Sequence, residues 1–224
     1  MALRAVVFDL DGTLVETAPD LHAVLAELLE RERLRIPPLE AVRGMIGDGA
    51  KMLIRRAHEW QGLDLSPDRL DRLYAWFLER YTAEPARFSA PYRGVPEALR
   101  ALRERGLRLG VCTNKPQVPS ERLLEAVGLA PWIDVVTGGD LLPVRKPDPG
   151  HLAATLEALS ASPAEAVMVG DSANDVAVAR GLGIPCLLVS FGYTTKPARE
   201  LGADRVIDRF DELLSALNDL AGSP

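Results

Sequence analysis

The chain has 224 residues, little cysteine, no long hydrophobic run and no excess of basic residues. Its two cysteines, Cys112 and Cys186, lie inside apolar runs, which predicts buried free thiols and a reducing compartment. No apolar stretch approaches the roughly 20 residues of a membrane span, and Asp9 comes too early for a signal peptide. A net charge of −6 provides no basic face for nucleic acid. We therefore expect a cytoplasmic protein that binds neither membranes nor nucleic acid.

What the sequence does contain is an alternation of short apolar runs with helix-length segments. Such alternation indicates a parallel sheet that is covered by helices on both faces. We expect strands at residues 4–10, 107–112, 133–137, 166–169, 185–189 and 205–207. The helices expected between the later strands span residues 121–127, 152–159 and 173–182. The predicted fold class is therefore α/β, a doubly wound parallel sheet with a Rossmann-like core.

One long interruption separates the first strand from the second. A βαβ unit takes about 30 residues, whereas nearly a hundred lie between Leu10 and Leu107. The segment "LHAVLAELLERE" has the helical period of 3.6, and further helices are expected at residues 49–60 and 68–81. We predict an inserted all-helical cap domain, residues 15–86, above a core formed by residues 1–14 and 87–224.

The first strand runs into two acidic residues in the stretch "AVVFDLDGTL". Alternation along the backbone places Asp9 and Asp11 on the same side. Two carboxylates this close repel each other unless a cation lies between them. Ligands of parallel sheets bind beyond the carboxyl ends of the strands. This strand end therefore predicts a cation and a binding site.

Three more strand ends carry polar residues. They are Thr113-Asn114-Lys115-Pro116, Lys146-Pro147-Asp148-Pro149 and Asp171-Ser172-Ala173-Asn174-Asp175. Taken singly, each has an ordinary explanation: Thr113 as a helix N-cap, Lys146 as a surface lysine. Together they supply what phosphoryl transfer needs, because hydroxyl and N–H groups bind phosphoryl oxygens, a lysine offsets charge and carboxylates hold a hard cation.

Other polar segments favour structural roles. The stretch "GDGAKM" does not fit the GxxxxGK[ST] phosphate loop and has no preceding strand, so it predicts a turn that opens a helix. The histidines lack metal-ligand spacing and are interpreted as surface or packing residues: His22, His58 and His151.

The ordered set of Asp9-Leu10-Asp11-Gly12-Thr13, Thr113, Lys146 and Gly170-Asp171-Ser172 with Asp175 resembles the four motifs of the haloacid dehalogenase-like hydrolases. The resemblance covers the whole chain, helical cap included. In that family the first aspartate is a nucleophile, and the second distinguishes phosphotransferases from dehalogenases. A halide leaves without a proton, whereas an alkoxide needs one, so Asp11 favours a phosphate ester.

Within the family, the chain is similar to bacterial phosphoglycolate phosphatases. The matching stretches are "FDLDGTLVETAPDL", "IGDGA", "CTNKP", "KPDP", "VGDSANDV" and "FGYT", with Glu16 departing from a frequent aspartate at the cap hinge. The resemblance implies a Mg²⁺-dependent phosphatase that hydrolyses a small phosphate monoester, and 2-phosphoglycolate is the first candidate. A phosphatase or mutase for another ester, such as a sugar phosphate, stays open. A phosphate-binding module without catalysis is disfavoured by Asp9 and Asp11. The chain is expected as a monomer or a homodimer.

The resemblance also implies a role for each motif residue. Asp9 would attack phosphorus to form an aspartyl-phosphate, and Asp11 would protonate the leaving alcohol. The phosphoryl oxygens would be bound by Gly12, Thr113 and Asn114, with Lys146 between Asp9 and the phosphoryl group. The expected Mg²⁺ ligands are Asp9, the Asp11 carbonyl and Asp171, with Asp175 in the outer shell.

The choice among esters must come from the cap, because the motifs contact only the phosphoryl group. Four cations lie near the glycine turn of the cap: Arg43, Lys51, Arg55 and Arg56. Arg43 and Lys51 flank that turn most closely and are the first candidates to reach a substrate carboxylate. A solvated basic helix face is the equally open alternative.

Overall fold

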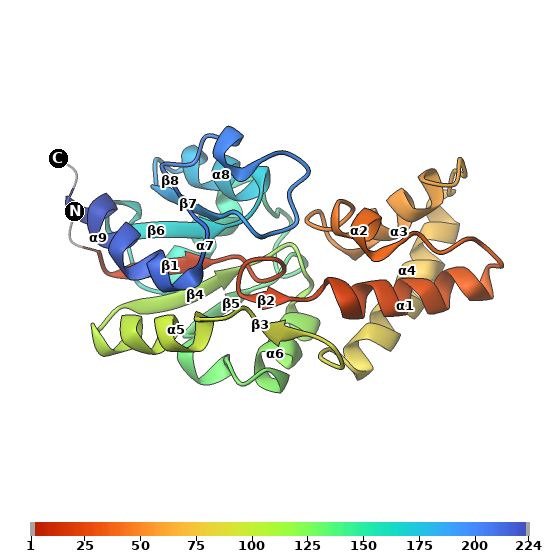
Figure 1. Cartoon of the computed structure of the whole chain (residues 1–224), viewed down its shortest axis with the longest axis horizontal. Coiled ribbons are helices and arrows are strands. Elements are labelled where there is room, and N and C mark those ends of the chain that lie inside the picture. The colour runs from red at the N-terminus through yellow and green to blue at the C-terminus, as the bar shows by residue number, and fades with distance from the viewer. Residues whose placement is uncertain (1–2, 223–224) are drawn as a thin grey trace.

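A computed structural model describes residues 3–222 and contains one six-stranded sheet in the order β5-β4-β1-β6-β7-β8 (Figure 1). Every neighbouring pair in this sheet is parallel. The strands are β1 (Ala5–Phe8), β4 (Arg108–Cys112), β5 (Val135–Thr137), β6 (Ala166–Gly170), β7 (Cys186–Val189) and β8 (Arg205–Ile207). All six predicted strands are thus confirmed, with ends that differ by a few residues.

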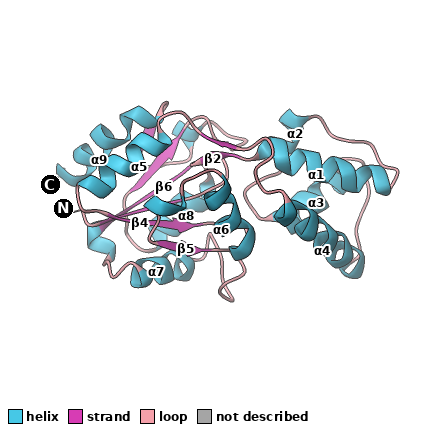
Figure 2. Ribbon diagram, turned by 90° about the horizontal axis from the view of Figure 1, so that it is seen from below, coloured by secondary structure: helices cyan, strands magenta, loops and turns pink. Residues whose placement is uncertain are grey.

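Helices cover both faces of the sheet (Figure 2), and all four residues of the central strand β1 are therefore buried. Val6 and Phe8 of β1 pack in a cluster with helices α5 (Val95–Glu104), α6 (Gln117–Ala126) and α9 (Leu213–Gly222). Ala5 and Val7 point the other way, into a cluster with α7 (Pro149–Ala158) and α8 (Ala173–Gly181). This alternation is what a doubly wound fold requires of a central strand.

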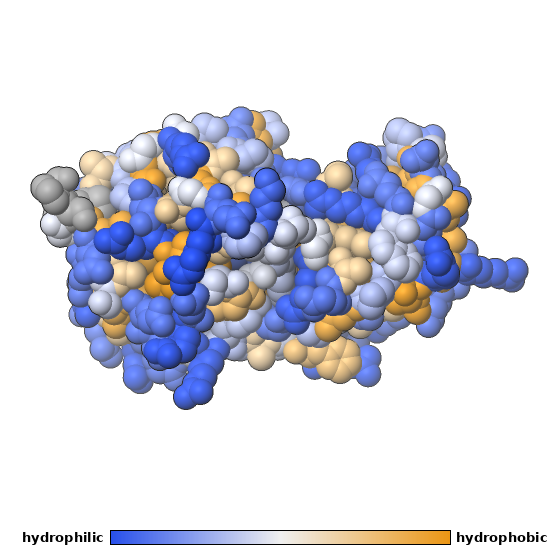
Figure 3. Space-filling view, turned by 45° about the horizontal axis from the view of Figure 1, so that its top comes forward, coloured by the Kyte–Doolittle hydropathy of each residue, from blue (hydrophilic) through white to orange (hydrophobic). Residues whose placement is uncertain are grey.

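The inserted segment forms a separate group of helices beyond the carboxyl end of β1 (Figure 1). Its helices are α1 (Ala18–Arg31), α2 (Leu39–Arg43), α3 (Ala50–Glu59) and α4 (Pro67–Ala83). They enclose their own apolar cluster, which includes Leu25, Ile54 and Phe77. Seen from the upper side, the surface is indented between this cap and the core (Figure 3).

A two-stranded antiparallel ribbon lies where the chain leaves and re-enters the core. It pairs β2 (Val15–Glu16) with β3 (Ala90–Pro91). The domain boundaries at 14/15 and 86/87 stay a prediction, and β2 and β3 lie on the cap and core sides of them.

Local backbone chemistry explains the main differences from the expected boundaries. β1 ends at Phe8 because the Leu10 carbonyl accepts the N–H groups of Leu14 and Val15, which turns the chain. Helix α6 begins at Gln117, four residues before the expected start, because Pro119 falls in its first turn, where a missing N–H costs nothing. Three of the α-helices, α2 in the cap and α5 and α9 in the core, had no individual counterpart among the expected helices.

The expectations for the two cysteines, the glycine turn and two of the histidines are confirmed. Cys112 and Cys186 are free and buried. Gly49 is the N-cap of α3 with φ +81°, so the glycine turn does open a helix. His58 and His151 are buried among other side chains. Among the described residues, no helix combines the length and apolar character that crossing a bilayer demands.

Candidate active site

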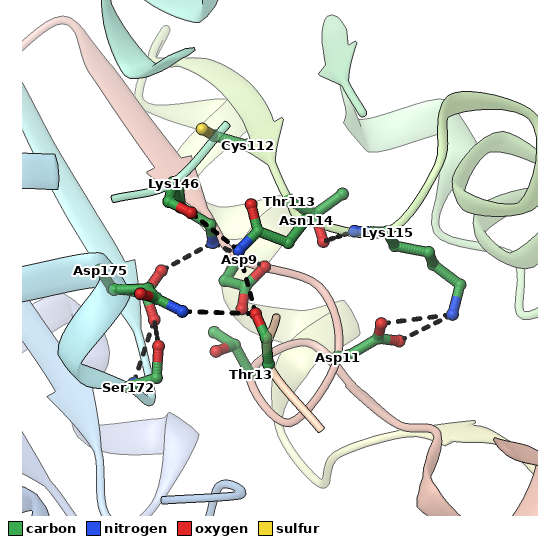
Figure 4. Close-up of polar contacts among 12 residues, drawn as sticks. Asp9, Asp11, Thr13, Cys112, Thr113, Asn114, Lys115, Lys146, Ser172 and Asp175 are labelled. Atoms are coloured by element: carbon green, nitrogen blue, oxygen red, sulfur yellow. Dashed lines mark hydrogen bonds and ion pairs between the residues drawn. The ribbon is translucent and has the colours of Figure 1, made fainter. Parts of the chain in front are cut away.

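The polar strand ends meet at one edge of the sheet, beneath the cap. The loop after β1, residues 9–13 (the Asp9 loop), is held by a hydrogen bond from the Asp9 N–H to the Val169 carbonyl at 2.8 Å. Figure 4 shows Lys146 and Lys115 on opposite sides of Asp9. We call Asp9, Lys146, Asp171 and Asp175 the core side of the site. Asp11, Lys115 and Tyr81 are its cap side.

Lys146 joins two buried carboxylates on the core side. Its Nζ lies 2.9 Å from Oδ1 of Asp9 and 2.7 Å from Oδ1 of Asp175. The contact to Asp9 is an ion pair without hydrogen-bond geometry, so this buried oxygen has no hydrogen-bond donor. Burial, opposed by Lys146, raises the pKa of Asp9 to about 6. Burial also acts to lower the pKa of Lys146, but the two carboxylates outweigh it and raise that pKa above its usual value.

Asp171, which follows β6, is held in place from several directions. The Tyr193 N–H donates to its Oδ2 at 2.6 Å, and the Thr13 hydroxyl donates to its Oδ1 at 3.4 Å. Glycine is required at Gly12, where φ is +84° and a Cβ would lie 2.6 Å from Oδ2 of Asp171. At Gly192 a Cβ would lie 2.1 Å from the Cβ of Asp171. The position of this carboxylate therefore depends on close backbone approach.

Three carboxylates of the core side could share a metal ion. Oxygens of Asp9, Asp171 and Asp175 lie within 4.8 Å of one another, and all three residues are buried. Burial, with Asp175 and Asp9 nearby, holds the pKa of Asp171 well above its usual range. Such a set is unfavourable without a cation, and its hard oxygen donors fit a divalent ion such as Mg²⁺.

Asp175 is already occupied by other partners. Besides its contact with Lys146, its Oδ2 accepts the N–H groups of Asp171 and Ser172 at 3.2 and 3.0 Å. The Ser172 hydroxyl donates to the same oxygen at 2.7 Å. These bonds orient the loop that carries Asp171.

The cap side contains a second buried ion pair. Nζ of Lys115 lies 3.1 and 3.2 Å from the two oxygens of Asp11, and the side chains are 4% and 14% exposed. The same Nζ lies 4.2 Å from the ring centroid of Tyr81, on cap helix α4. Burial acts to lower the pKa of Lys115, but Asp11 outweighs it and raises that pKa. The lysine therefore stays charged while it touches both parts of the molecule.

Thr113 and Asn114 lie between the two sides. The Thr113 hydroxyl accepts the Lys115 N–H at 3.2 Å. The Asn114 amide donates to the carbonyls of Gly47, in the cap, and Lys146, at 3.0 and 3.1 Å. Its Oδ1 is buried and has no hydrogen-bond partner. The structure thus brings together all the motif residues that the sequence predicts.

A cavity lies between the Asp9 loop and the cap. Its polar lining comes from the core and includes Asp9, Asp11, Thr113, Asn114 and Lys115. Its cap wall is apolar apart from one hydroxyl and backbone groups, with side chains from Leu21, Ile46, Ala50, Leu53, Phe77, Leu78 and Tyr81. A bound ligand would therefore meet charge on one wall and hydrocarbon on the other.

The two cap cations favoured by the sequence do not line this cavity. The Arg43 guanidinium lies 2.8 Å from a carboxylate oxygen of Glu16, at the hinge. Lys51 is half exposed, and its Nζ lies 2.6 Å from an oxygen of Asp71. The prediction that one of them reaches the substrate is not supported by this arrangement.

Several contact residues were missed by sequence reasoning. Lys115 stands directly after Asn114 in a strand-end motif, so its position could have drawn attention. Tyr81 carries no such signal. Glu16 accepts hydrogen bonds from the hydroxyls of Tyr193 and Tyr92 at 2.7 and 3.1 Å, and these contacts join segments far apart in the chain.

A parallel sheet with a cluster of aspartates at the carboxyl ends of its strands is the arrangement that the family comparison bears on. The haloacid dehalogenase-like hydrolase family matches residues 3–183. The chain belongs to this family.

Relatives with established names extend the comparison. The chain is 46% identical over 205 residues to the phosphoglycolate phosphatase of Caulobacter vibrioides, covering 92% of this chain and 86% of the relative. It is 43% identical over 225 residues to the phosphoglycolate phosphatase of Rhodospirillum rubrum, covering 99% and 92%. The crystal structure of a predicted phosphoglycolate phosphatase from Haemophilus somnus superposes with a TM-score of 0.90 at 30% identity, covering 96% and 98%. These matches confirm the predicted family, the fold and the class of phosphoric monoester hydrolases.

Proposed function

We propose that this phosphatase hydrolyses 2-phosphoglycolate in a Mg²⁺-dependent reaction, through an aspartyl-phosphate on Asp9. One observation carries the proposal: two aspartates of one loop lie in one cavity, each paired with its own buried lysine. Asp9 beside Lys146 suits a nucleophile, and Asp11, on the same loop and in the same cavity, is the carboxyl group available for acid–base work at the ester oxygen. A module that only bound phosphate would need no proton donor.

In the first half-reaction, a carboxylate oxygen of Asp9 attacks phosphorus in line, and the bond from phosphorus to the ester oxygen breaks. Asp11 gives its proton to that ester oxygen, so the alcohol leaves neutral. The Thr113 hydroxyl and the Asn114 N–H would bind phosphoryl oxygens. The expected contribution of Gly12 is not supported, because its N–H donates to the Val15 carbonyl at 3.0 Å. Lys146 offsets charge between Asp9 and the phosphoryl group.

In the second half-reaction, Asp11 accepts a proton from the water that attacks the aspartyl-phosphate, which restores both aspartates. Asp9, Asp171 and the Asp11 carbonyl would hold Mg²⁺, with Asp175 orienting from the outer shell. The bound ion would offset the negative charge of the carboxylates and of the phosphoryl group.

Two observations support 2-phosphoglycolate as the substrate. The relatives at 46% and 43% identity are phosphoglycolate phosphatases. The apolar cap wall offers few partners for the several hydroxyls of a sugar phosphate, each of which costs about 1–3 kcal/mol when buried unpaired, whereas one carboxylate can pair with Lys115 in the same cavity.

The test is phosphate release from a panel of phosphorylated metabolites with purified protein and Mg²⁺. We expect 2-phosphoglycolate to give the highest kcat/KM. EDTA should abolish turnover, Mg²⁺ should restore it, and Ca²⁺ should substitute poorly because its coordination shell is larger and more flexible. A tenfold preference for a neutral sugar phosphate would refute 2-phosphoglycolate as the substrate. Full activity in excess chelator would refute the dependence on Mg²⁺.

A further inference from the structure

The cavity between core and cap offers few charges to a ligand. Among the described residues that line it, the charged side chains are Asp9, Asp11 and Lys115. A substrate such as 2-phosphoglycolate brings a carboxylate in addition to its phosphoryl group. A buried carboxylate without a cationic partner is strongly unfavourable. Lys115 is therefore the one cation of that lining that can accompany it.

The surroundings of Lys115 leave room for a second acceptor. Its ammonium has three N–H donors. Asp11 lies on one side of Nζ, at 3.1 Å, and the face of the Tyr81 ring lies at 4.2 Å. The two Asp11 oxygens accept up to two of the three donors, at 3.1 and 3.2 Å. The ring face attracts the cation without a directed hydrogen bond, so the third donor stays available for another carboxylate.

The position of Asp11 places a substrate carboxylate near this ammonium. To protonate the ester oxygen, Asp11 must lie about 2.6–3.2 Å from it. In 2-phosphoglycolate one methylene separates that oxygen from the carboxyl carbon, so the carboxylate lies about 3 Å away. Lys115 contacts the same Asp11 carboxyl group. These distances allow the substrate carboxylate to reach the ammonium when both lie on the same side of the Asp11 carboxyl group.

We propose that Lys115 binds the carboxylate of the substrate and so determines the preference for anionic esters. The inference rests on the proposed function, since it assumes a substrate with a carboxylate next to the ester. It moves the specificity-determining cation from the cap surface, where Lys51 pairs with Asp71, to the core loop after β4. The apolar cap wall then shapes the cavity, and recognition of charge depends on Lys115 alone among the lining residues described.

The experiment compares two esters of the same shape, 2-phosphoglycolate and the phosphate ester of glycolamide, in which a neutral amide replaces the carboxylate. The wild-type enzyme should favour the carboxylate. Lys115→Met keeps the apolar stem but loses the charge, and should reduce the ratio of the two kcat/KM values roughly tenfold or more, mainly through KM. Lys115→Arg should retain most of the preference. Lys51→Met, on an exposed cap cation, is the matched control and should leave the ratio unchanged.

The ratio isolates recognition from general damage, because losing the partner of Asp11 slows both esters alike. If Lys115→Met turns over too slowly, calorimetry in an Asp9→Asn background gives the corresponding ratio of the dissociation constants of the two esters. A folded Lys115→Met variant with the wild-type ratio overturns the role of Lys115 and leaves the proposed function intact. If the wild-type enzyme does not discriminate between the two esters, the proposed substrate is wrong, and the role of Lys115 is wrong with it.

Discussion

The two sides of the active site share one loop but are assembled from different parts of the molecule. On the core side, Asp9, Lys146 and Asp171 come from loops that follow core strands, and their partners do as well. On the cap side, Asp11 is paired with Lys115 of the core, which in turn lies against Tyr81 of cap helix α4. The core side is complete within the sheet domain, whereas the cap side is complete only where the two domains meet.

This difference separates two tasks of the enzyme. Attack on phosphorus needs groups that keep their positions, and strand ends of a buried sheet provide them. Recognition of the leaving group needs a site that can admit the substrate and then exclude water. In the proposed mechanism, the core side carries out the attack and the cap side recognises the leaving group. Substitutions on the core side should therefore affect all esters alike, and those on the cap side should depend on the ester.

The largest expected effect is that of Asp9→Asn. The amide cannot attack phosphorus, so no turnover of any ester should be detected in a phosphate-release assay. An unchanged melting temperature and far-UV circular dichroism would show that the variant is folded. Turnover above about one-thousandth of the wild-type rate would exclude Asp9 as the nucleophile.

Asp11→Asn should reduce kcat by about 10²–10⁴, the range typical of general acid–base catalysis. The loss in forming the intermediate should be smaller for nitrophenyl phosphate, because a good leaving group departs without a proton. Rapid-quench measurement of phosphoenzyme formation with both kinds of ester checks this. Equal losses for the two esters would contradict the role of Asp11 as the acid.

Tyr81→Leu should lower kcat/KM for 2-phosphoglycolate by about 2- to 30-fold, because it removes the aromatic face beside Lys115. Tyr81→Phe keeps that face and should behave like the wild type, since the Tyr81 hydroxyl has no hydrogen-bond partner. Tyr74 on the same helix lies 5.2 Å from Nζ of Lys51, so Tyr74→Leu is the matched control without an effect on activity. Similar losses for both leucine variants would place the effect in the helix rather than at Lys115.

The smallest effect concerns the pH dependence of stability. His151 Nδ1 accepts the Lys146 N–H at 3.2 Å, and burial, with Lys146 nearby, lowers the pKa of this imidazole below 6.5. As the pH falls, the His151 ring is therefore protonated at a higher pH in the unfolded chain than in the folded protein. His151 thus contributes a decline in the free energy of unfolding below about pH 6.5, until its folded-state pKa is reached, whereas the raised pKa values of Asp9 and Asp171 contribute the opposite slope.

Denaturant unfolding between pH 7.5 and 5, in the presence of EDTA, measures this contribution as the difference between the wild type and His151→Gln. Stability relative to the wild type should rise in His151→Gln as the pH falls, and it should stay constant in His22→Gln, at a partly exposed histidine. Titration of the His151 ring by NMR gives a direct check: a pKa at or above 6.5 in the folded protein would refute the prediction.

The sequence by itself determined the sheet and the core side of the site. Strand signals are local, because the apolar runs and the residues that end them lie within a few positions of one another. Parallel strands bring their carboxyl ends to one edge, so the order of motifs was enough to predict that Asp9, Thr113, Lys146 and Asp171 meet. The Lys146 pairs with Asp9 and Asp175 needed no knowledge of how the cap packs.

Which residues form the cap side was decided only by the tertiary structure. Whether a lysine binds substrate or a surface carboxylate depends on which helix packs against it, and no local period encodes that choice. Lys51, near the glycine turn, was one of two expected candidates with Arg43, yet the packing of α3 on α4 pairs it with Asp71. Lys115, which drew no assignment from the sequence, is buried between Asp11 and Tyr81 because α4 lies over the core loop after β4.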